Sequence, residues 1–383
     1  MALRNTRPMP MSTTESIPAN LTRIIADAIE KAGGWIGFDT FMALALYAPG
    51  WGYYANGSTK FGQMPQGLVG EAGVEGAGSD FVTAPEISPL FGQALARQVA
   101  QVLEATGTDE LWEFGAGTGA LALQLLDALG DRVRSYTIVD LSDSLKARQR
   151  ERLAGHAGKV QWVSALPAHM RGVVVGNEVL DAMPVQLLAR VAGAWHERGV
   201  ALAQGQLVWA DKPSTLRPPV DIDGEHDYLT EIHAQGEAFV RTLADHLQLG
   251  AAFLLDYGFP ESEYYHVQRS GGTVMCHRAH RADADPLSDV GLKDITAHVN
   301  FTGVAVAAQD AGLDVLGYTN QAHFLMNCGL VEAMQSQPLQ ARVAAQKLLM
   351  EHEMGELFKV VALGRGVDAP LLGFARGDRT HRL

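Results

Sequence analysis

Three glycines at alternate positions, Gly115, Gly117 and Gly119, lie between a short apolar segment and a run of helix-forming residues, and Glu113 precedes them. A glycine turn between a strand and a helix lets a ligand approach the backbone and directs the free N–H groups of the helix towards it. The dinucleotide fingerprint requires the spacing GxGxxG, whereas this turn has the spacing GxGxG. Glu113 would repel a pyrophosphate but would attract the cationic amino-acid end of S-adenosyl-L-methionine (AdoMet). Asp140, at the end of the next predicted strand, could bind ribose hydroxyls, so the set predicts an AdoMet site; a tight turn without a ligand is the alternative.

A second polar set follows the predicted fourth strand, where the chain has the sequence GNEVLDAMP at 176–184. Ligands of open α/β sheets bind at the carboxyl ends of the strands, so this segment would lie beside the reactive methyl group. Methyl transfer is an in-line displacement that requires a positioned nucleophile and stabilised charge. Glu178 and Asp181 would present two carboxylates on one side of a helical turn and clamp a guanidinium. Helix capping by Glu178 and a solvent position for Asp181 are the alternatives.

The elements that must position these residues alternate along the chain from residue 110, which predicts an α/β fold with a mostly parallel, Rossmann-like sheet. Strands are expected at 110–114, 133–140, 160–165, 172–178 and 251–258, with two closing strands at 313–319 and 357–366. Helices are expected at 119–129, 142–155, 237–250 and 294–312. Two closing strands that pair antiparallel at one edge are typical of the seven-stranded sheet of AdoMet-dependent methyltransferases and untypical of a dinucleotide-binding half.

The remaining segments suggest additions to this domain. We expect residues 1–105 to form an N-terminal extension, with a helix at about 20–32, a glycine-rich loop at 62–78 and a further helix after Ser88-Pro89. Residues 106–383 would form the methyltransferase domain, with an accessory insertion at about 190–231 that contains a hairpin. We consider the glycine-rich loop a candidate lid over a peptide channel.

Composition excludes several function classes. The net charge of −13 argues against a nucleic-acid surface, and no apolar run reaches the roughly 20 residues of a membrane span. Cys276 and Cys328 are far apart, and the HxxH pair at His277 and His280 lacks a second ligand pair, so neither a disulfide framework nor a metal site is indicated. A cytoplasmic protein is expected, or one of the mitochondrial matrix if the acid-free first 14 residues are a transit peptide. Pairing of the chain with a second copy is left open.

The series of motifs resembles the MidA-like family of methyltransferases. The resemblance rests on SDFVTAPEISPLFGQ, the glycine motif, YTIVDLS, GNEVLDAMP, LLDYGFP, DITAHVNF and TNQAHFL, which together cover about 34–366. It implies a class I AdoMet methyltransferase fold. The family's mitochondrial member is a protein arginine methyltransferase that acts on a respiratory complex I subunit, so the resemblance also implies a protein substrate and a role in complex I assembly.

The resemblance also assigns roles residue by residue. It implies cofactor contacts from the three glycines, the ribose acid Asp140 and its neighbour Leu141, and from Glu86 in the Thr-Pro-Glu segment, and it implies catalysis by Asn177, Glu178 and Asp181. The family usually has proline where Ala116 stands and glutamate where Asp140 stands, changes that keep the chemistry.

Other residues are weaker candidates for this site. Asp256 and Tyr257 end the fifth predicted strand at the same crevice, and Asp294 and His298 could line it, although ordinary strand-end and core roles are alternatives. Two other functions compete with methyl transfer: a NAD(P)-linked oxidoreductase, which the glycine spacing disfavours, and a non-catalytic chaperone that uses the fold to bind a partner subunit.

Overall fold

The computed structural model describes residues 16–56, 83–140, 142–278 and 281–383, and its largest sheet has eight strands. The spatial order is β15-β16-β10-β5-β2-β3-β4, and the short β14 pairs with β10. These strands are β2 (Glu110–Phe114), β3 (Ser135–Val139), β4 (Val160–Val163), β5 (Met170–Asn177), β10 (Leu247–Phe259), β14 (Val299–Asn300), β15 (Asp314–Asn320) and β16 (Phe358–Arg365). All neighbours pair in parallel except β16, which is antiparallel to both β10 and β15. The predicted α/β fold, with two closing strands at one edge, is confirmed.

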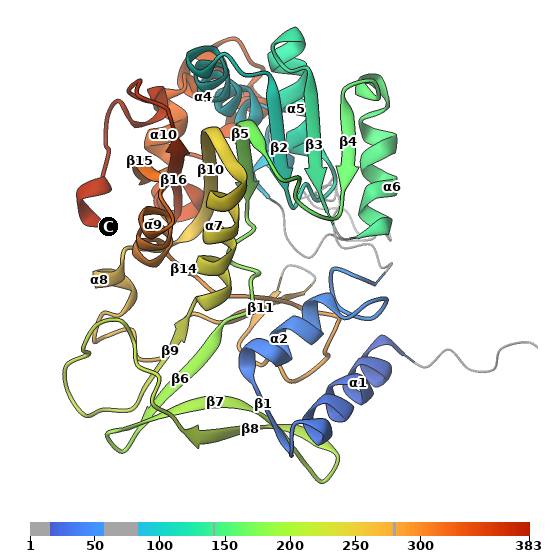
Figure 1. Ribbon diagram of the computed structural model, residues 1–383, viewed down its shortest axis with the longest axis vertical. Helices are drawn as coiled ribbons and strands as arrows, with labels where there is room; N and C mark the ends of the chain where they lie inside the picture. The colour runs from blue at the N-terminus through green and yellow to red at the C-terminus, as the bar shows by residue number, and fades with distance from the viewer. Residues whose placement is uncertain (1–15, 57–82, 141, 279–280) are drawn as a thin grey trace, which may run out of the picture.

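The middle parts of the central strands β5 and β10, 173–175 and 251–255, are runs of apolar residues that are buried on both faces of the sheet, as parallel sheets covered by helices require. One face is covered by α4 (Leu90–Thr106) and α5 (Ala120–Leu129), whose leucines and alanines share one core with Val173 and Val175. The other face is covered by α7 (Ala234–His246) and α9 (Phe301–Asp310) (Figure 1). The sheet therefore lies between two helical layers, with its carboxyl edge towards the lower half of the molecule in Figure 1.

A second, five-stranded antiparallel sheet forms that lower half. It joins a strand of the N-terminal segment to strands of the insertion: β1 (Trp35–Gly37), β6 (Gln186–Val191), β7 (Ala194–Ala203), β8 (Gln206–Pro213) and β9 (Tyr228–Ile232). The hairpin expected in the insertion is confirmed as β7 and β8. Helices α1 (Ile17–Lys31) and α2 (Phe38–Tyr47) share a core with this sheet. The first two helices and the insertion thus form one unit, whereas α4 packs on the large sheet.

The prediction of a single helix at 294–312 is wrong in its first part. Residues Asp294–Thr296 form β13, which pairs with β11 (Met275–Arg278), itself paired with β12 (Arg281–Asp283). Helix α9 begins only at Phe301, because the Asn300 side chain accepts a hydrogen bond from the Gly303 N–H and caps it. The buried strand pairing of β13 overrides the local helical pattern.

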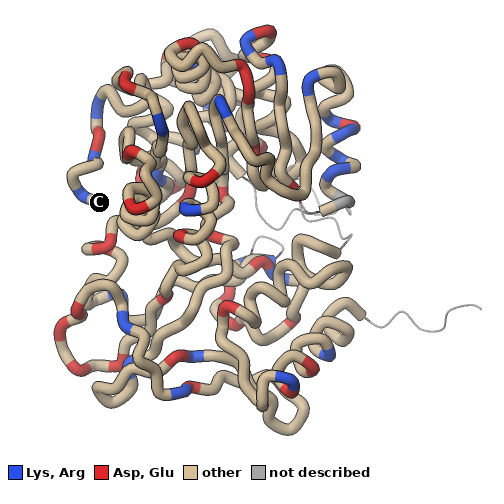
Figure 2. Tube along the Cα trace, viewed as in Figure 1, with Lys and Arg blue, Asp and Glu red and all other residues tan. Residues whose placement is uncertain are grey.

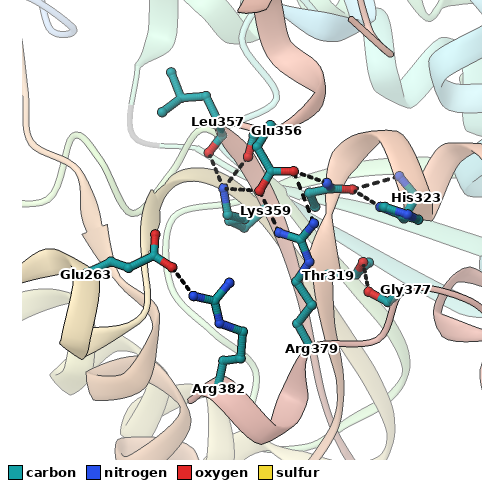
Figure 3. A network of polar contacts seen from close by, with 10 residues as sticks. Glu263, Thr319, His323, Glu356, Leu357, Lys359, Gly377, Arg379 and Arg382 are labelled. Carbon is teal, nitrogen blue, oxygen red and sulfur yellow. Dashed lines mark hydrogen bonds and ion pairs between the residues drawn. The ribbon is translucent and has the colours of Figure 1, made fainter. Parts of the chain in front are cut away.

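The C-terminal residues return to the carboxyl edge of the large sheet. Arg379 forms an ion pair with Glu356, at 2.5 Å from Nη1 to Oε1, and Arg382 contacts Glu263 (Figure 3). The remaining helical elements of the described chain are α3 (Ala84–Ile87), α6 (Asp143–Arg152), α8 (Glu261–Tyr264), α10 (Gln321–Asn327), α11 (Leu330–Gln335), α12 (Leu339–Gln346) and a π-helical turn at Glu351–Gly355. Short 3₁₀ turns lie at Gly130–Arg132, Ala154–His156, Leu372–Phe374 and Thr380–Arg382.

Basic and acidic residues are interspersed over both halves of the described chain (Figure 2). This pattern differs from the continuous basic stripe that duplex binding requires. None of the helices in the described ranges combines the length and the apolar character of a membrane span.

Candidate functional site

The glycine turn connects β2 to α5 at the carboxyl edge of the large sheet. Gly115, Gly117 and Gly119 have φ angles of 62°, 52° and 82°, in the left-handed region that other residues rarely adopt. A Cβ at Gly115 would lie 3.2 Å from a methyl carbon of Val179. The alternation of glycines is therefore required by the backbone itself, and no side chain of the described residues caps the N-terminus of α5.

Asp140 follows β3, the strand next to β2, as predicted. Its Oδ1 accepts a hydrogen bond from the Ser142 N–H at 2.8 Å, and its Oδ2 accepts one from Gln149 Nε2 at 2.8 Å. Gln149 is fully buried on α6, and its Nε2 also donates to the Gly117 carbonyl at 2.9 Å. One amide thus fixes the carboxylate and the glycine turn relative to each other, a connection that the sequence analysis missed. The signal was an uncharged glutamine within the strongly charged helix DSLKARQRER.

Glu113 lies within β2 and is 2% exposed. The Tyr136 hydroxyl donates a hydrogen bond to its Oε2 at 2.6 Å. Burial raises the pKa of Glu113 to about 8, although the hydrogen bond from Tyr136 opposes this change. Its carboxyl group is therefore mostly protonated at pH 7, whereas the sequence analysis assumed a full negative charge.

Glu86, on the short helix α3, contacts the glycine turn from the other side. Its Oε1 accepts hydrogen bonds from Thr118 Oγ1 and, at 2.8 Å, from Arg152 Nη1 at the end of α6. The neighbouring carbonyl of Pro85 accepts a hydrogen bond from Gln124 of α5 at 2.7 Å. These hydrogen bonds hold α3 against the glycine turn and against α5.

The last residue of β5 and the segment that follows it contain the three residues predicted to be catalytic. The segment is not the helical turn that the spacing of Glu178 and Asp181 predicted: Glu178 has a φ of 55° and its N–H donates to the Leu255 carbonyl at 2.8 Å. The chain bends around the end of β10, because that strand supplies hydrogen-bond acceptors at this point. Asn177 Nδ2 donates to Glu178 Oε1 at 3.0 Å. Two buried acceptor atoms of this segment, Asn177 Oδ1 and Asp181 Oδ1, have no hydrogen-bond partner among the described residues.

The electrostatics of this segment differ from those of surface acids. Burial, and then the charge of Asp181, raise the pKa of Glu178 to about 8. Burial raises the pKa of Asp181 to about 6, against hydrogen bonds that include one from Tyr257. The pKa of Asp256 is also raised well above its usual value, by burial and by the charges of Asp181 and Glu178. Three carboxyl groups therefore share a poorly solvated region, an arrangement that favours the arrival of a cation.

The N-terminal segment reaches this region from the lower half of the molecule. The Tyr54 hydroxyl lies 2.9 Å from both carboxylate oxygens of Asp294, which is 2% exposed on β13. The Tyr47 hydroxyl donates to the Ala182 carbonyl at 2.8 Å, and the Tyr47 and Tyr54 rings stack with centroids 5.6 Å apart. Tyr47 was missed because a tyrosine at the end of a helix has no distinctive sequence signal.

His298, predicted to lie on a helix, instead precedes β14 and packs edge-on against Tyr257, with ring centroids 5.2 Å apart. Burial lowers its pKa to about 4, so its imidazole is neutral at pH 7.

The structure brings together the glycine turn, Asp140 and Glu86 on one side and residues 177–181 on the other, both at the carboxyl edge. Leu141, the glycine-rich loop at 62–78 and His280 lie outside the described residues.

The residues present fit AdoMet. A left-handed glycine turn, a helix N-terminus without a side-chain cap among the described residues and a carboxylate after the adjacent strand form a suitable cradle for its amino-acid and ribose groups. The sheet order and the antiparallel β16 are those of AdoMet-dependent methyltransferases. Fold and site together define a class I AdoMet-dependent methyltransferase.

The comparisons with known proteins agree with this assignment to the AdoMet-dependent methyltransferases. A model of a family of S-adenosyl-L-methionine-dependent methyltransferases matches residues 94–319, and the chain belongs to this family. A crystal structure of a superfamily member from Burkholderia thailandensis, bound to S-adenosyl-homocysteine, is 49% identical, covers 98% of this chain and 100% of its own, and superposes with a TM-score of 0.90.

Two curated relatives are more distant. The protein arginine methyltransferase NDUFAF7 homolog, mitochondrial, of Caenorhabditis elegans is 26% identical over 90% of this chain and 86% of its own. The Danio rerio protein arginine methyltransferase NDUFAF7, mitochondrial, is 26% identical over 84% of this chain and 80% of its own. The predicted cofactor and enzyme class are confirmed, and the NAD(P)-linked alternative is wrong.

Proposed function

We propose that this protein is an arginine N-methyltransferase that modifies a partner protein. One observation carries the proposal: the segment after β5 contains buried hydrogen-bond acceptors, Asn177 Oδ1 and Asp181 Oδ1, without partners among the described residues. An unpaired buried acceptor costs about 1–3 kcal/mol, so such a pair favours a ligand that brings N–H donors. A guanidinium has five N–H donors in a planar fork and a permanent positive charge, and it meets both requirements.

The relatives support the same substrate class, since both curated proteins are named protein arginine methyltransferases. The partner as a respiratory complex subunit is a further prediction, based on the family resemblance. The cytoplasm is the expected compartment, and the mitochondrial matrix is the alternative, in keeping with the mitochondrial relatives.

We assign the cofactor to the glycine turn, with Asp140 and its neighbour Leu141 at the ribose, with Glu113 towards the amino-acid end, and with Glu86 bonded to Thr118 of the turn. Bound AdoMet supplies an electrophilic methyl group. Glu178 and Asp181 would hold the guanidinium, and their carboxylates would accept the proton that the nitrogen loses. Their raised pKa values, about 8 and about 6, make them better proton acceptors than ordinary surface acids.

The test is methyl transfer from labelled AdoMet to synthetic peptides that contain either arginine or lysine at one position. We expect label in the arginine peptide alone, and a loss of about 100-fold or more in kcat/KM for Glu178→Gln and Asp181→Asn. Asp314→Asn, at an exposed carboxylate on the same sheet, is the matched control and should retain full activity. AdoMet binding without transfer to any protein or peptide would favour the non-catalytic chaperone instead.

A further inference from the structure

Asp256, at the carboxyl end of β10, is 1% exposed and makes an unusual set of hydrogen bonds. Its Oδ2 accepts three consecutive backbone N–H groups, from Val179 at 3.1 Å, Leu180 at 2.9 Å and Asp181 at 3.2 Å. Its Oδ1 accepts the Tyr257 N–H at 3.0 Å. One side chain thus satisfies three successive amides of the segment that follows β5.

These amides cannot be satisfied by regular structure. Glu178 has a positive φ of 55°, which ends the strand and is unfavourable for a residue other than glycine. The segment then bends around β10, with the Glu178 N–H bonded to the Leu255 carbonyl. Convergent N–H groups of this kind form a concave, positively polarised nest that selects an anion. In this protein the acceptor oxygen in the nest is Oδ2 of the Asp256 side chain.

We propose that Asp256 is the positioning residue of the methyl-acceptor site. By fixing the backbone of residues 179–181, it sets the directions of the Glu178 and Asp181 side chains. Its hydrogen bonds go to residues 179–181 and to the Tyr257 N–H, and none of those found among the described residues reaches the glycine turn, so we expect it to act mainly on the acceptor side. This inference rests on the proposed function, because it assigns the two carboxylates to the substrate.

Glu231 offers a matched control in the accessory sheet. It is fully buried, its Oε1 accepts the Thr273 and Val274 N–H groups at 2.6 and 3.1 Å, and its Oε2 accepts the Tyr264 hydroxyl. Glu231→Gln therefore perturbs a buried carboxylate that also holds backbone amides, but away from residues 177–181.

The experiment compares Asp256→Asn with Glu231→Gln, each in the wild-type and in the Glu178→Gln background. The asparagine keeps the shape but replaces one acceptor by a donor, which opposes a backbone N–H. We expect Asp256→Asn to lower kcat/KM for the arginine peptide about 10- to 100-fold, because displaced catalytic groups cost that much. AdoMet affinity by calorimetry should change by a smaller factor, less than about threefold, because Asp256 forms no direct hydrogen bond with the described residues of the glycine turn.

The double variants separate positioning from general stability. If Asp256 acts through Glu178 and Asp181, Asp256→Asn should have a much smaller effect once Glu178 is glutamine. The proposal would be overturned if the double variant lost kcat/KM by the full product of the two single-variant factors. Wild-type activity in Asp256→Asn would overturn it as well. Glu231→Gln should keep wild-type kcat/KM in both backgrounds whatever its effect on the melting temperature.

Amide hydrogen exchange gives a readout without turnover. Asp256→Asn should accelerate exchange at Val179, Leu180 and Asp181, and Glu231→Gln should not. If the wild type methylates no arginine peptide, the proposed function fails, while this exchange pattern still decides whether Asp256 holds the segment. If Asp256→Asn does not fold, the wild type suffices: exchange at residues 179–181 as fast as in exposed loops would refute the inference.

Discussion

At the scale of single residues, the site combines two unlike groups: glycines that give the backbone its shape, and acids that are poorly solvated. Gly115, Gly117 and Gly119 all have positive φ, so the shape of the turn depends on residues that have no Cβ. Glu178 and Asp181 contribute charge where water is scarce, and their raised pKa values follow from that burial.

Gly117→Val should weaken AdoMet binding more than it weakens folding. A β-branched residue opposes the φ of 52° at this turn and places methyl groups where the ligand approaches. We expect at least about a 10-fold rise in the AdoMet Kd by calorimetry, with thermal melting of the ligand-free protein as the control. Unchanged affinity would mean that the cofactor does not bind at this turn.

The rate of methyl transfer should rise with pH across the range in which the acceptor acids ionise. Asp181, with a pKa of about 6, and Glu178, with a pKa of about 8, are protonated below these values and then neither attract a guanidinium nor accept its proton. We expect kcat/KM to increase from about pH 6 to pH 8 and the upper step to disappear in Glu178→Gln. A profile that is flat from about pH 5.5 to 9 would contradict this assignment.

The same shift predicts a pH dependence of stability with the opposite sign. Burial raises the folded-state pKa of Glu178 from its usual 4.5 to about 8, so between these values the native state holds a proton that the unfolded chain has lost. The contribution of protonated Glu178 to the free energy of unfolding is fully present below about pH 4.5 and is lost as pH rises through 8. Melting temperatures should fall less steeply over this range in Glu178→Gln than in the wild type, and parallel curves would argue against a raised pKa.

At the scale of elements, the end of β10 organises the acceptor side, and the short β13 and the segment after α2 complete it. Asp256 lies on β10, Asp294 on β13, and Tyr54 follows α2 in the sequence. The oxygen of the Tyr54 hydroxyl is 2.9 Å from Asp294, although the two residues are 240 positions apart. An N-terminal segment therefore contributes to a site built on the large sheet.

Tyr54→Phe should affect the acceptor side alone. Losing the hydroxyl removes a donor from the buried Asp294 carboxylate, at a cost of about 1–3 kcal/mol in the free energy of unfolding. We expect a lower kcat/KM for the arginine peptide and an unchanged AdoMet Kd. Tyr228→Phe, which removes a hydroxyl bonded to the His266 carbonyl in the accessory unit, is the control and should leave both constants unchanged. Loss of AdoMet affinity in Tyr54→Phe would argue against a site in which the cofactor side and the acceptor side are separate.

At the scale of the whole molecule, two units meet at the carboxyl edge of the large sheet (Figure 1). The lower unit combines α1, α2 and β1 with the insertion in one core. The C-terminal residues close the opposite part of this edge through Arg379 and Arg382 (Figure 3). Segments from both ends of the chain therefore lie along the carboxyl edge of the large sheet.

Arg379→Ala should lower stability without affecting the cofactor. Both guanidinium nitrogens contact Glu356, at 2.5 and 3.2 Å, and the arginine is partly shielded from water. A loss of about 1 kcal/mol corresponds to a fall of about 2 °C in melting temperature. Arg376→Ala, at an exposed residue of the same tail, is the control. Equal melting temperatures for both variants would show that the Glu356 pair adds nothing.

The amino-acid sequence by itself determined the fold class and the cofactor. Strand and helix patterns of 5 to 15 residues, the GxGxG spacing and the two closing strands are local signals, because backbone conformation and burial impose them within each segment. The positive φ at all three glycines and the antiparallel β16 agree with those signals. The error at 294–312 arose where a buried strand pairing outweighed a local helical pattern.

The tertiary structure alone decided how the acceptor side is built. Asp256 accepts the amides of residues that precede it by 75 to 77 positions, and Gln149 joins Asp140 to the carbonyl of Gly117. Such hydrogen bonds depend on where distant backbone groups remain unpaired, which no periodicity in the sequence encodes. For this reason the sequence predicted which acids matter, Glu178 and Asp181, but assigned them to a helical turn, whereas packing around β10 holds them in a strained loop.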